Sequence, residues 1–181
     1  MEQLWLYLNT PDVLNKFANN RFFLIFFVIV LSSVKRSAYQ SLWLAMLINL
    51  PGTALHECAH FIVGLFFNAK PVRFSIFPQK KEDRYVMGQV GFSNLKFYNA
   101  LPSAMAPLSL LLLAYLLNLH FFEIFPFNFA TYIAYLFLMT VLIENAMPSK
   151  MDFVQGFRFI SGVLLYAFIV FAGIAVYSRY F

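Results

Sequence analysis

Two histidines four residues apart, with a glutamate directly after the first, make up the stretch His56-Glu57-Cys58-Ala59-His60. In an α-helix, residues i and i+4 lie on one face about 6 Å apart, so both imidazoles can bind one metal ion. Glu57 is rotated by about 100° from His56 and can reach the remaining coordination position, where it can take a proton from a metal-bound water. The pattern predicts one zinc ion per chain, with His56 and His60 as ligands and Glu57 as the general base.

A third protein ligand is needed, because catalytic zinc sites usually combine three side chains with one water. Asp152 is the preferred candidate. It follows a segment broken by Pro148, at a depth similar to that of the histidines, where a short carboxylate can reach a metal between helices. Glu144, at the end of an expected span, is the alternative.

The other residues of types that can bind a metal are expected to have structural roles only. His120 and Glu123 are expected to be an interfacial histidine and a solvated glutamate, and Cys58 is expected to be an inert core thiol. The histidines and Glu57 could also simply hydrogen-bond across helices. A carboxylate inside a membrane costs about 2.5–3.5 kcal/mol on insertion scales, however, so a functional partner such as zinc is favoured.

The composition indicates a membrane protein. Of 181 residues, 61% are hydrophobic and 12% are charged, whereas soluble domains carry about 45–50% apolar and about 25% charged residues. This excludes a soluble globular enzyme, a disordered tail and a fibrous repeat. Since each crossing needs about 20 residues, four or five crossings leave room for short loops and one small excursion.

Apolar runs and their breaks locate the expected elements. They are an interfacial helix in residues 1–21, a short first run at 22–34, a second at 37–68, a polar excursion at 69–99, and further spans at 100–119, 129–145 and 159–177. The fold class predicted is an α-helical polytopic membrane protein with four to five transmembrane helices. It forms a single domain over 1–181, with an amino-terminal helix and first span (1–36), a catalytic core (37–158) and a last span (159–181).

The polar excursion has the pattern of a β-hairpin or small sheet. Apolar and polar residues alternate over 72–77, β-forming residues are frequent over 85–92, and a charged turn at 79–84 separates the two stretches.

The distribution of Lys and Arg predicts the orientation. With five spans and a cytoplasmic amino terminus, only Lys35, Arg36 and Arg179 lie outside, and the other ten cations are cytoplasmic. If the first run merely dips into the membrane, the amino terminus moves outside but the hairpin stays cytoplasmic. The cations are then expected to face an anionic bilayer rather than a nucleic acid. The small size favours a bacterial cell membrane.

Four local motifs resemble, in order, those of the site-2 protease family of intramembrane zinc metalloproteases. They are the helix from Ala54 to Phe61, the β-rich segment Met87-Gly88-Gln89-Val90, Ala106-Pro107-Leu108, and Asn145-Ala-Met-Pro148 followed by Met151-Asp152. The chain departs from the family pattern at Phe153, where a glycine is usual, and at Ser109, where an alanine is usual. The interval from Pro148 to Asp152 is one residue shorter than the commonest form.

The resemblance implies that His56, His60 and Asp152 bind zinc and that Glu57 is the catalytic base. It further implies that Asn145 positions the substrate or the developing oxyanion, and that strands within 72–92 present an extended substrate. The predicted activity is hydrolysis of a peptide bond in a membrane-spanning or membrane-associated protein, with the active site toward the cytoplasm. The alternatives are a catalytically inactive, zinc-containing membrane binding or regulatory protein of the same fold, and a transporter that uses the cluster as an ion relay.

Overall fold

The computed structural model describes residues 2–19, 21–38, 41–81, 84–86 and 88–180. The chain forms two compact units, Met1–Gly52 with Leu111–Glu144, and Thr53–Leu110 with Asn145–Phe181. Helices α4 (Leu42–Phe66), α6 (Ser109–Ile124) and α7 (Phe129–Asn145) each include residues of both units.

Two short helices open the first unit, where the sequence predicts one. They are α1 (Glu2–Leu8) and α2 (Pro11–Asn19). Pro11 is the first residue of α2, a position where its missing N–H is not needed and its fixed φ suits a new helix. Helix α3 (Arg21–Ala38) follows and ends with Lys35 and Arg36 in its last turn, where cations interact favourably with the free carbonyls.

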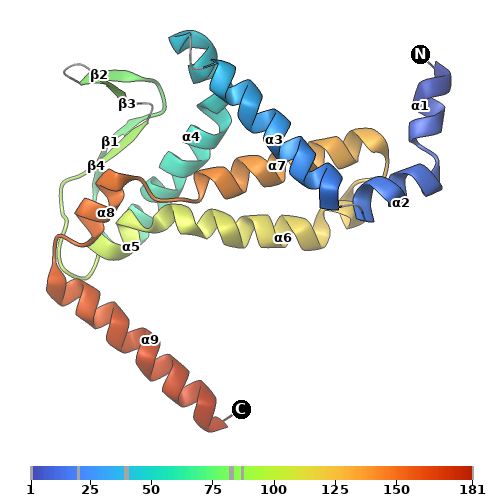
Figure 1. Cartoon of the computed structure of the whole chain (residues 1–181). Helices are drawn as coiled ribbons and strands as arrows, with labels where there is room; N and C mark the ends of the chain where they lie inside the picture. Colours follow the sequence, from blue (N-terminus) through green and yellow to red (C-terminus); the bar gives the residue numbers. More distant parts are fainter. Residues whose placement is uncertain (1, 20, 39–40, 82–83, 87, 181) are drawn as a thin grey trace. The chain divides into compact units, whose positions relative to one another are not determined.

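Helices α3 and α7 cross obliquely in Figure 1, and both run from right to left in the view. Near their beginnings, the Tyr132 hydroxyl donates a hydrogen bond to the Phe17 carbonyl, 3.3 Å away. At their ends, Lys35 of α3 forms an ion pair with Glu144 of α7. The five-span prediction places Lys35 outside the membrane and Glu144 at its cytoplasmic face, whereas the two side chains form an ion pair.

Aromatic packing joins α6 to α7 in the first unit. The Phe121 ring is 5.5 Å from that of Tyr135, and the Tyr135 hydroxyl donates to Oδ1 of Asn118 at 2.7 Å. Phe121 and Tyr132 are buried there. Because the tyrosine hydroxyl finds a polar partner, its ring can be packed without an unsatisfied group.

In the second unit, α4 ends in a turn that directs the chain into the first strand. The Asn68 amide donates to the Leu65 carbonyl and the Ala69 amide to the Gly64 carbonyl, at 3.0 and 2.8 Å. Asn68 has φ 56, the left-handed conformation that asparagine tolerates at this position of a helix end.

The predicted β-hairpin is confirmed. Strand β1 (Pro71–Ser75) pairs antiparallel with β4 (Gln89–Phe92), and β2 (Gln79–Lys81) pairs antiparallel with β3 (Arg84–Val86). The register aligns Phe74 with Val90 and Lys80 with Tyr85. The tip of the predicted charged turn, at 82–83, lies outside the described residues.

The span predicted to begin at residue 100 is interrupted. Helix α5 (Ala100–Ala104) ends before a 3₁₀ turn over Ala106–Leu108, and only then does α6 begin. Pro107 explains the break, because it cannot donate a helical hydrogen bond and disfavours helical geometry in the residue before it.

The short helix α8 and the long helix α9 complete the second unit. Helix α8 (Lys150–Gly156) lies against α5, and a Cβ at Gly156 would be 3.1 Å from that of Ala104. Helix α9 (Ile160–Tyr180) is anchored at its beginning, where the Tyr166 hydroxyl donates to the Tyr98 carbonyl at 2.5 Å.

Within the described residues, two helical segments are long and apolar enough to cross a membrane, Ala106–Ile124 and Ile160–Tyr180. Helices α7 and α8 together form a third candidate, bent by 49° at the break between them. These helices indicate a membrane protein and confirm the expected spans at 129–145 and 159–177 as helices. A span count of four or five goes beyond this observation.

Candidate metal centre

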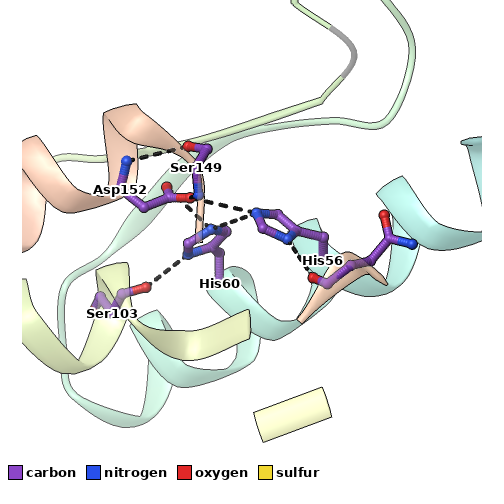
Figure 2. Close-up of polar contacts among 6 residues, drawn as sticks. His56, His60, Ser103, Ser149 and Asp152 are labelled. Carbon is purple, nitrogen blue, oxygen red and sulfur yellow. Dashed lines mark hydrogen bonds and ion pairs between the residues drawn. The ribbon is translucent and has the colours of Figure 1, made fainter. Parts of the chain in front are cut away.

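Three side chains from two helices converge in the second unit. His56 and His60 lie one turn apart on α4, and Asp152 reaches them from α8 (Figure 2). The two Nε2 atoms are 3.2 Å apart. Asp152 Oδ1 lies 3.3 Å from Nε2 of His60, and its Oδ2 lies 3.5 Å from Nε2 of His56. The described residues therefore contain a group that could hold a metal ion.

Backbone carbonyls orient both imidazoles. Nδ1 of His56 is 2.8 Å from the Asn145 carbonyl, and Nδ1 of His60 is 2.8 Å from the Ser103 carbonyl (Figure 2). A carbonyl oxygen only accepts, so each Nδ1 carries the proton and donates it. In the neutral rings, Nε2 is then left with a lone pair directed at the cluster, which is the tautomer that a metal-binding histidine needs.

The cluster is electron-rich and sheltered. Two Nε2 lone pairs and a carboxylate face one another at 3.2–3.5 Å, and the side chains of His60 and Asp152 are only 4% and 16% exposed. Groups of this kind repel one another unless a cation or a proton lies between them. The arrangement is therefore suited to binding a positive ion.

The start of α8 fixes the aspartate. Ser149 is the N-cap, and its hydroxyl accepts a hydrogen bond from the Asp152 amide at 3.2 Å. In return, Oδ2 of Asp152 accepts from the Ser149 amide at 2.6 Å (Figure 2). This capping box ties the aspartate to the helix start and limits the directions its carboxylate can take.

Phe153 does not prevent this approach. The departure from the family pattern at this residue calls the ligand role of Asp152 into question, because a bulky neighbour could redirect the carboxylate. Phe153 is 44% exposed, and its ring instead stacks on that of Phe157, the residue that follows α8, with ring centroids 6.3 Å apart. Asp152 reaches both histidines with Phe153 in place.

Glu57, the predicted base, is buried next to the hairpin. Glu57 is only 7% exposed. The backbone at Gly88 passes so close that an added Cβ would lie 2.6 Å from Oε1 of Glu57 and 2.6 Å from Cγ2 of Thr53. Gly88 is therefore required for its small size, and the segment before β4 covers the Glu57 carboxylate.

Asn145 belongs to the cluster through its backbone. Its carbonyl accepts the hydrogen bond from His56, as described above. The predicted contribution of its side chain to catalysis stays a prediction.

The other residues considered as metal ligands have different surroundings. In the first unit, Glu144 pairs with Lys35, and His120 pairs with Glu123 across one helical turn at 2.6 Å with both side chains exposed. Cys58 lies outside the metal-binding group, as expected, but it is exposed rather than part of a core.

Three contributors to the site were not predicted. The Ser103 and Asn145 carbonyls leave no signal in a sequence, since every residue has a carbonyl. The hydroxyl of Ser149 could have been found, because a serine three residues before an acidic residue at a helix start is the pattern of a capping box.

Comparison of the chain with protein-family models, with curated proteins and with solved structures finds no match. The interpretation of the cluster therefore depends on its own geometry and chemistry.

Proposed function

We propose that this protein is a membrane-embedded zinc endopeptidase that hydrolyses a peptide bond in a membrane-spanning or membrane-associated protein. The observation that carries the proposal is that Nε2 of His56 and Nε2 of His60 converge with the Asp152 carboxylate. Both histidines lie on α4, the helix that also bears Glu57. The motif resemblance to site-2 proteases supports the same assignment of roles.

The donor set and its dimensions favour zinc. Two imidazoles and one carboxylate form a ligand set typical of catalytic zinc. Zinc–ligand bonds of about 2.0–2.2 Å in tetrahedral geometry separate neighbouring ligand atoms by about 3.4 Å. The observed separations of 3.2, 3.3 and 3.5 Å lie around this value, so the cluster could close on zinc with little movement.

The remaining chemistry falls to residues beside the cluster. Bound zinc would polarise the scissile carbonyl and lower the pKa of a water molecule toward about 7. Glu57 would accept the proton from that water and deliver it to the leaving amine. The Asn145 amide would stabilise negative charge on the substrate oxygen. The Ser103 and Asn145 carbonyls would hold the imidazoles in their metal-binding orientation.

Glu57→Gln separates metal binding from catalysis. Purified wild-type protein should contain about one zinc per chain by elemental analysis, and Glu57→Gln should retain it. His56→Ala should lose it, because a ligand is removed. In cells, mass spectrometry of new amino termini in membrane proteins should find cleavage products with the wild type that vanish with Glu57→Gln. Products that persist at an undiminished level would contradict the proposal.

Glu57's burial beneath Gly88 favours one further candidate, a zinc-containing binding protein that does not cleave its partner. The two functions differ in their response to Gly88→Ala. In an enzyme, the added methyl would displace the Glu57 carboxylate and reduce product formation. Gly173→Ala is the matched control, since nothing lies within 4 Å of a Cβ at that position. A binding protein would give no product with any of these variants.

The contacts near the beginnings and at the ends of α3 and α7 favour four membrane crossings over five. Two helices that cross in the same sense must be separated by an odd number of crossings, and the long helices described between α3 and α7 are α4 and α6. Since α6 belongs to a segment that can cross by itself, α4 would enter the membrane without crossing it. The crossings would then be α3, α6, α7 and α9.

The arrangement with four crossings agrees equally well with the rule that Lys and Arg are enriched on the cytoplasmic side of the membrane. Lys16, Arg21 and Arg179 would lie outside, and the other ten cations would be cytoplasmic, together with the hairpin and the metal centre. In a bacterial host, after Cys58→Ser removes the native thiol, a membrane-impermeant maleimide should label Glu2→Cys but not Lys96→Cys in intact cells. The opposite labelling would overturn the proposed orientation.

A further inference from the structure

Lys35 and Glu144 form an ion pair between apolar helices, at the ends of α3 and α7. Their side chains are 19% and 32% exposed. Charged groups with so little access to solvent are costly unless each has a partner, and in membrane helices they are rare and commonly functional. The general preference of lysine for a membrane face explains its place at a helix end, but not its pairing with Glu144.

Glu144 immediately precedes the residue whose carbonyl orients His56. Asn145 ends α7, and the carbonyls of the last helical turn have no partner within the helix. The Asn145 carbonyl is instead 2.8 Å from Nδ1 of His56. Glu144 thus pairs with a charge within the first unit, and the next residue, Asn145, accepts from the His56 imidazole within the second.

The position of this helix end decides how well His56 can bind a metal. The Nδ1–H···O bond selects the ring tautomer and sets the direction of the Nε2 lone pair. A displacement of the α7 end by a fraction of an ångström would lengthen that bond. It would also turn Nε2 away from its partners, which lie 3.2 and 3.5 Å away in His60 and Asp152.

We infer that Lys35 is a positioning residue for the metal centre, acting through Glu144 and the end of α7. The inference rests on the proposed metal site and adds a control of that site from the amino-terminal part of the chain. Lys35 is 21 residues before His56 in sequence and contributes no ligand.

The test uses the full chain, purified in detergent, with Co²⁺ as the probe. Visible absorption reports the coordination geometry of cobalt, and a titration gives its affinity. Lys35→Met and Glu144→Gln should each weaken binding by about tenfold, the scale of lost outer contacts in metal sites, and should change the absorption bands. Arg36→Met is the matched control, because Arg36 is exposed on the same turn and should bind cobalt like the wild type.

The charge-reversed double variant K35E/E144K supplies the decisive measurement. It restores an ion pair of opposite polarity, so its affinity and spectrum should return to within about twofold of the wild type. Single variants that bind cobalt like the wild type would overturn the inference, as would a folded double variant no better than the singles. A wild-type protein that takes up no cobalt would overturn the metal centre itself, whereas the Glu57→Gln experiment tests the protease function separately.

Discussion

Among the residues that the structure describes, histidine and carboxylate side chains meet in two places, with opposite consequences. His120 and Glu123 approach to 2.6 Å, closer than either histidine of the cluster approaches Asp152, but both lie exposed on one helix at 55% and 69%. In the cluster, the side chains come from different helices, and His56 and His60 are 15% and 4% exposed. Proximity alone therefore does not identify a metal centre.

The orientation of the second ring nitrogen separates the two places. In the cluster, each Nδ1 donates to a backbone carbonyl, so each Nε2 presents a lone pair to its neighbours. In the exposed pair, Nδ1 itself faces the carboxylate. The first arrangement prepares two rings for a cation, and the second is an ordinary contact between neighbours on a helix surface.

Loss of His60 should have the largest effect. His60 is buried, and His60→Ala would remove the Nε2 atom that lies 3.2 Å from Nε2 of His56 and 3.3 Å from Oδ1 of Asp152. Affinity for zinc should fall by more than about a hundredfold, since even outer contacts of metal ligands are worth about 10–100-fold. Competition with a fluorescent chelator measures this affinity, and a value equal to that of the wild type would show that His60 is not a ligand.

Asp152→Asn should weaken zinc binding by about 10–100-fold. Asparagine keeps the shape of the side chain and can still accept from the Ser149 amide, but it carries no charge to offset that of the metal. Glu123→Gln is the matched control in the exposed pair and should leave the zinc affinity unchanged. Equal effects of the two substitutions, in the same chelator competition, would show that Asp152 is not a ligand.

Ser149→Ala should weaken zinc binding by about tenfold. The substitution removes the hydroxyl that accepts from the Asp152 amide, costing about 1 kcal/mol of helix capping and loosening the carboxylate. Ser149→Thr should restore most of the affinity, because threonine also caps helices. If alanine and threonine behave alike, the capping box does not help to position Asp152.

Part of this arrangement could be predicted from the sequence. The apolar runs at 129–145 and 159–177 predict two helices, and the alternation around a charged turn predicts the hairpin, since these patterns are local. The break at Pro107 was visible but was interpreted as lying inside a span. The direction of α3 relative to α7 could not be predicted, because it depends on a contact between residues 109 positions apart.

The site was predictable to the same extent. The spacing of His56 and His60 on a helix indicates a shared metal, and Asp152 was preferred to Glu144 as the carboxylate nearby. The acceptors for the two Nδ1 atoms come from distant backbone and have no residue type to mark them. The contact between Gly88 and Glu57 similarly depends on the packing of the hairpin against α4.

The smallest effect is expected for the exposed pair of His120 and Glu123, although their contact of 2.6 Å is shorter than those between the histidines and Asp152 in the cluster. His120→Ala should change the free energy of unfolding by no more than about 0.5 kcal/mol, because exposed pairs on one helix are screened by solvent and contribute little. Zinc content should also stay at the wild-type level. Thermal unfolding and elemental analysis of the same preparation measure both quantities. A loss of zinc would mean that the 2.6 Å contact between His120 and Glu123 belongs to a second metal site, because neither side chain lies in the group formed by His56, His60 and Asp152.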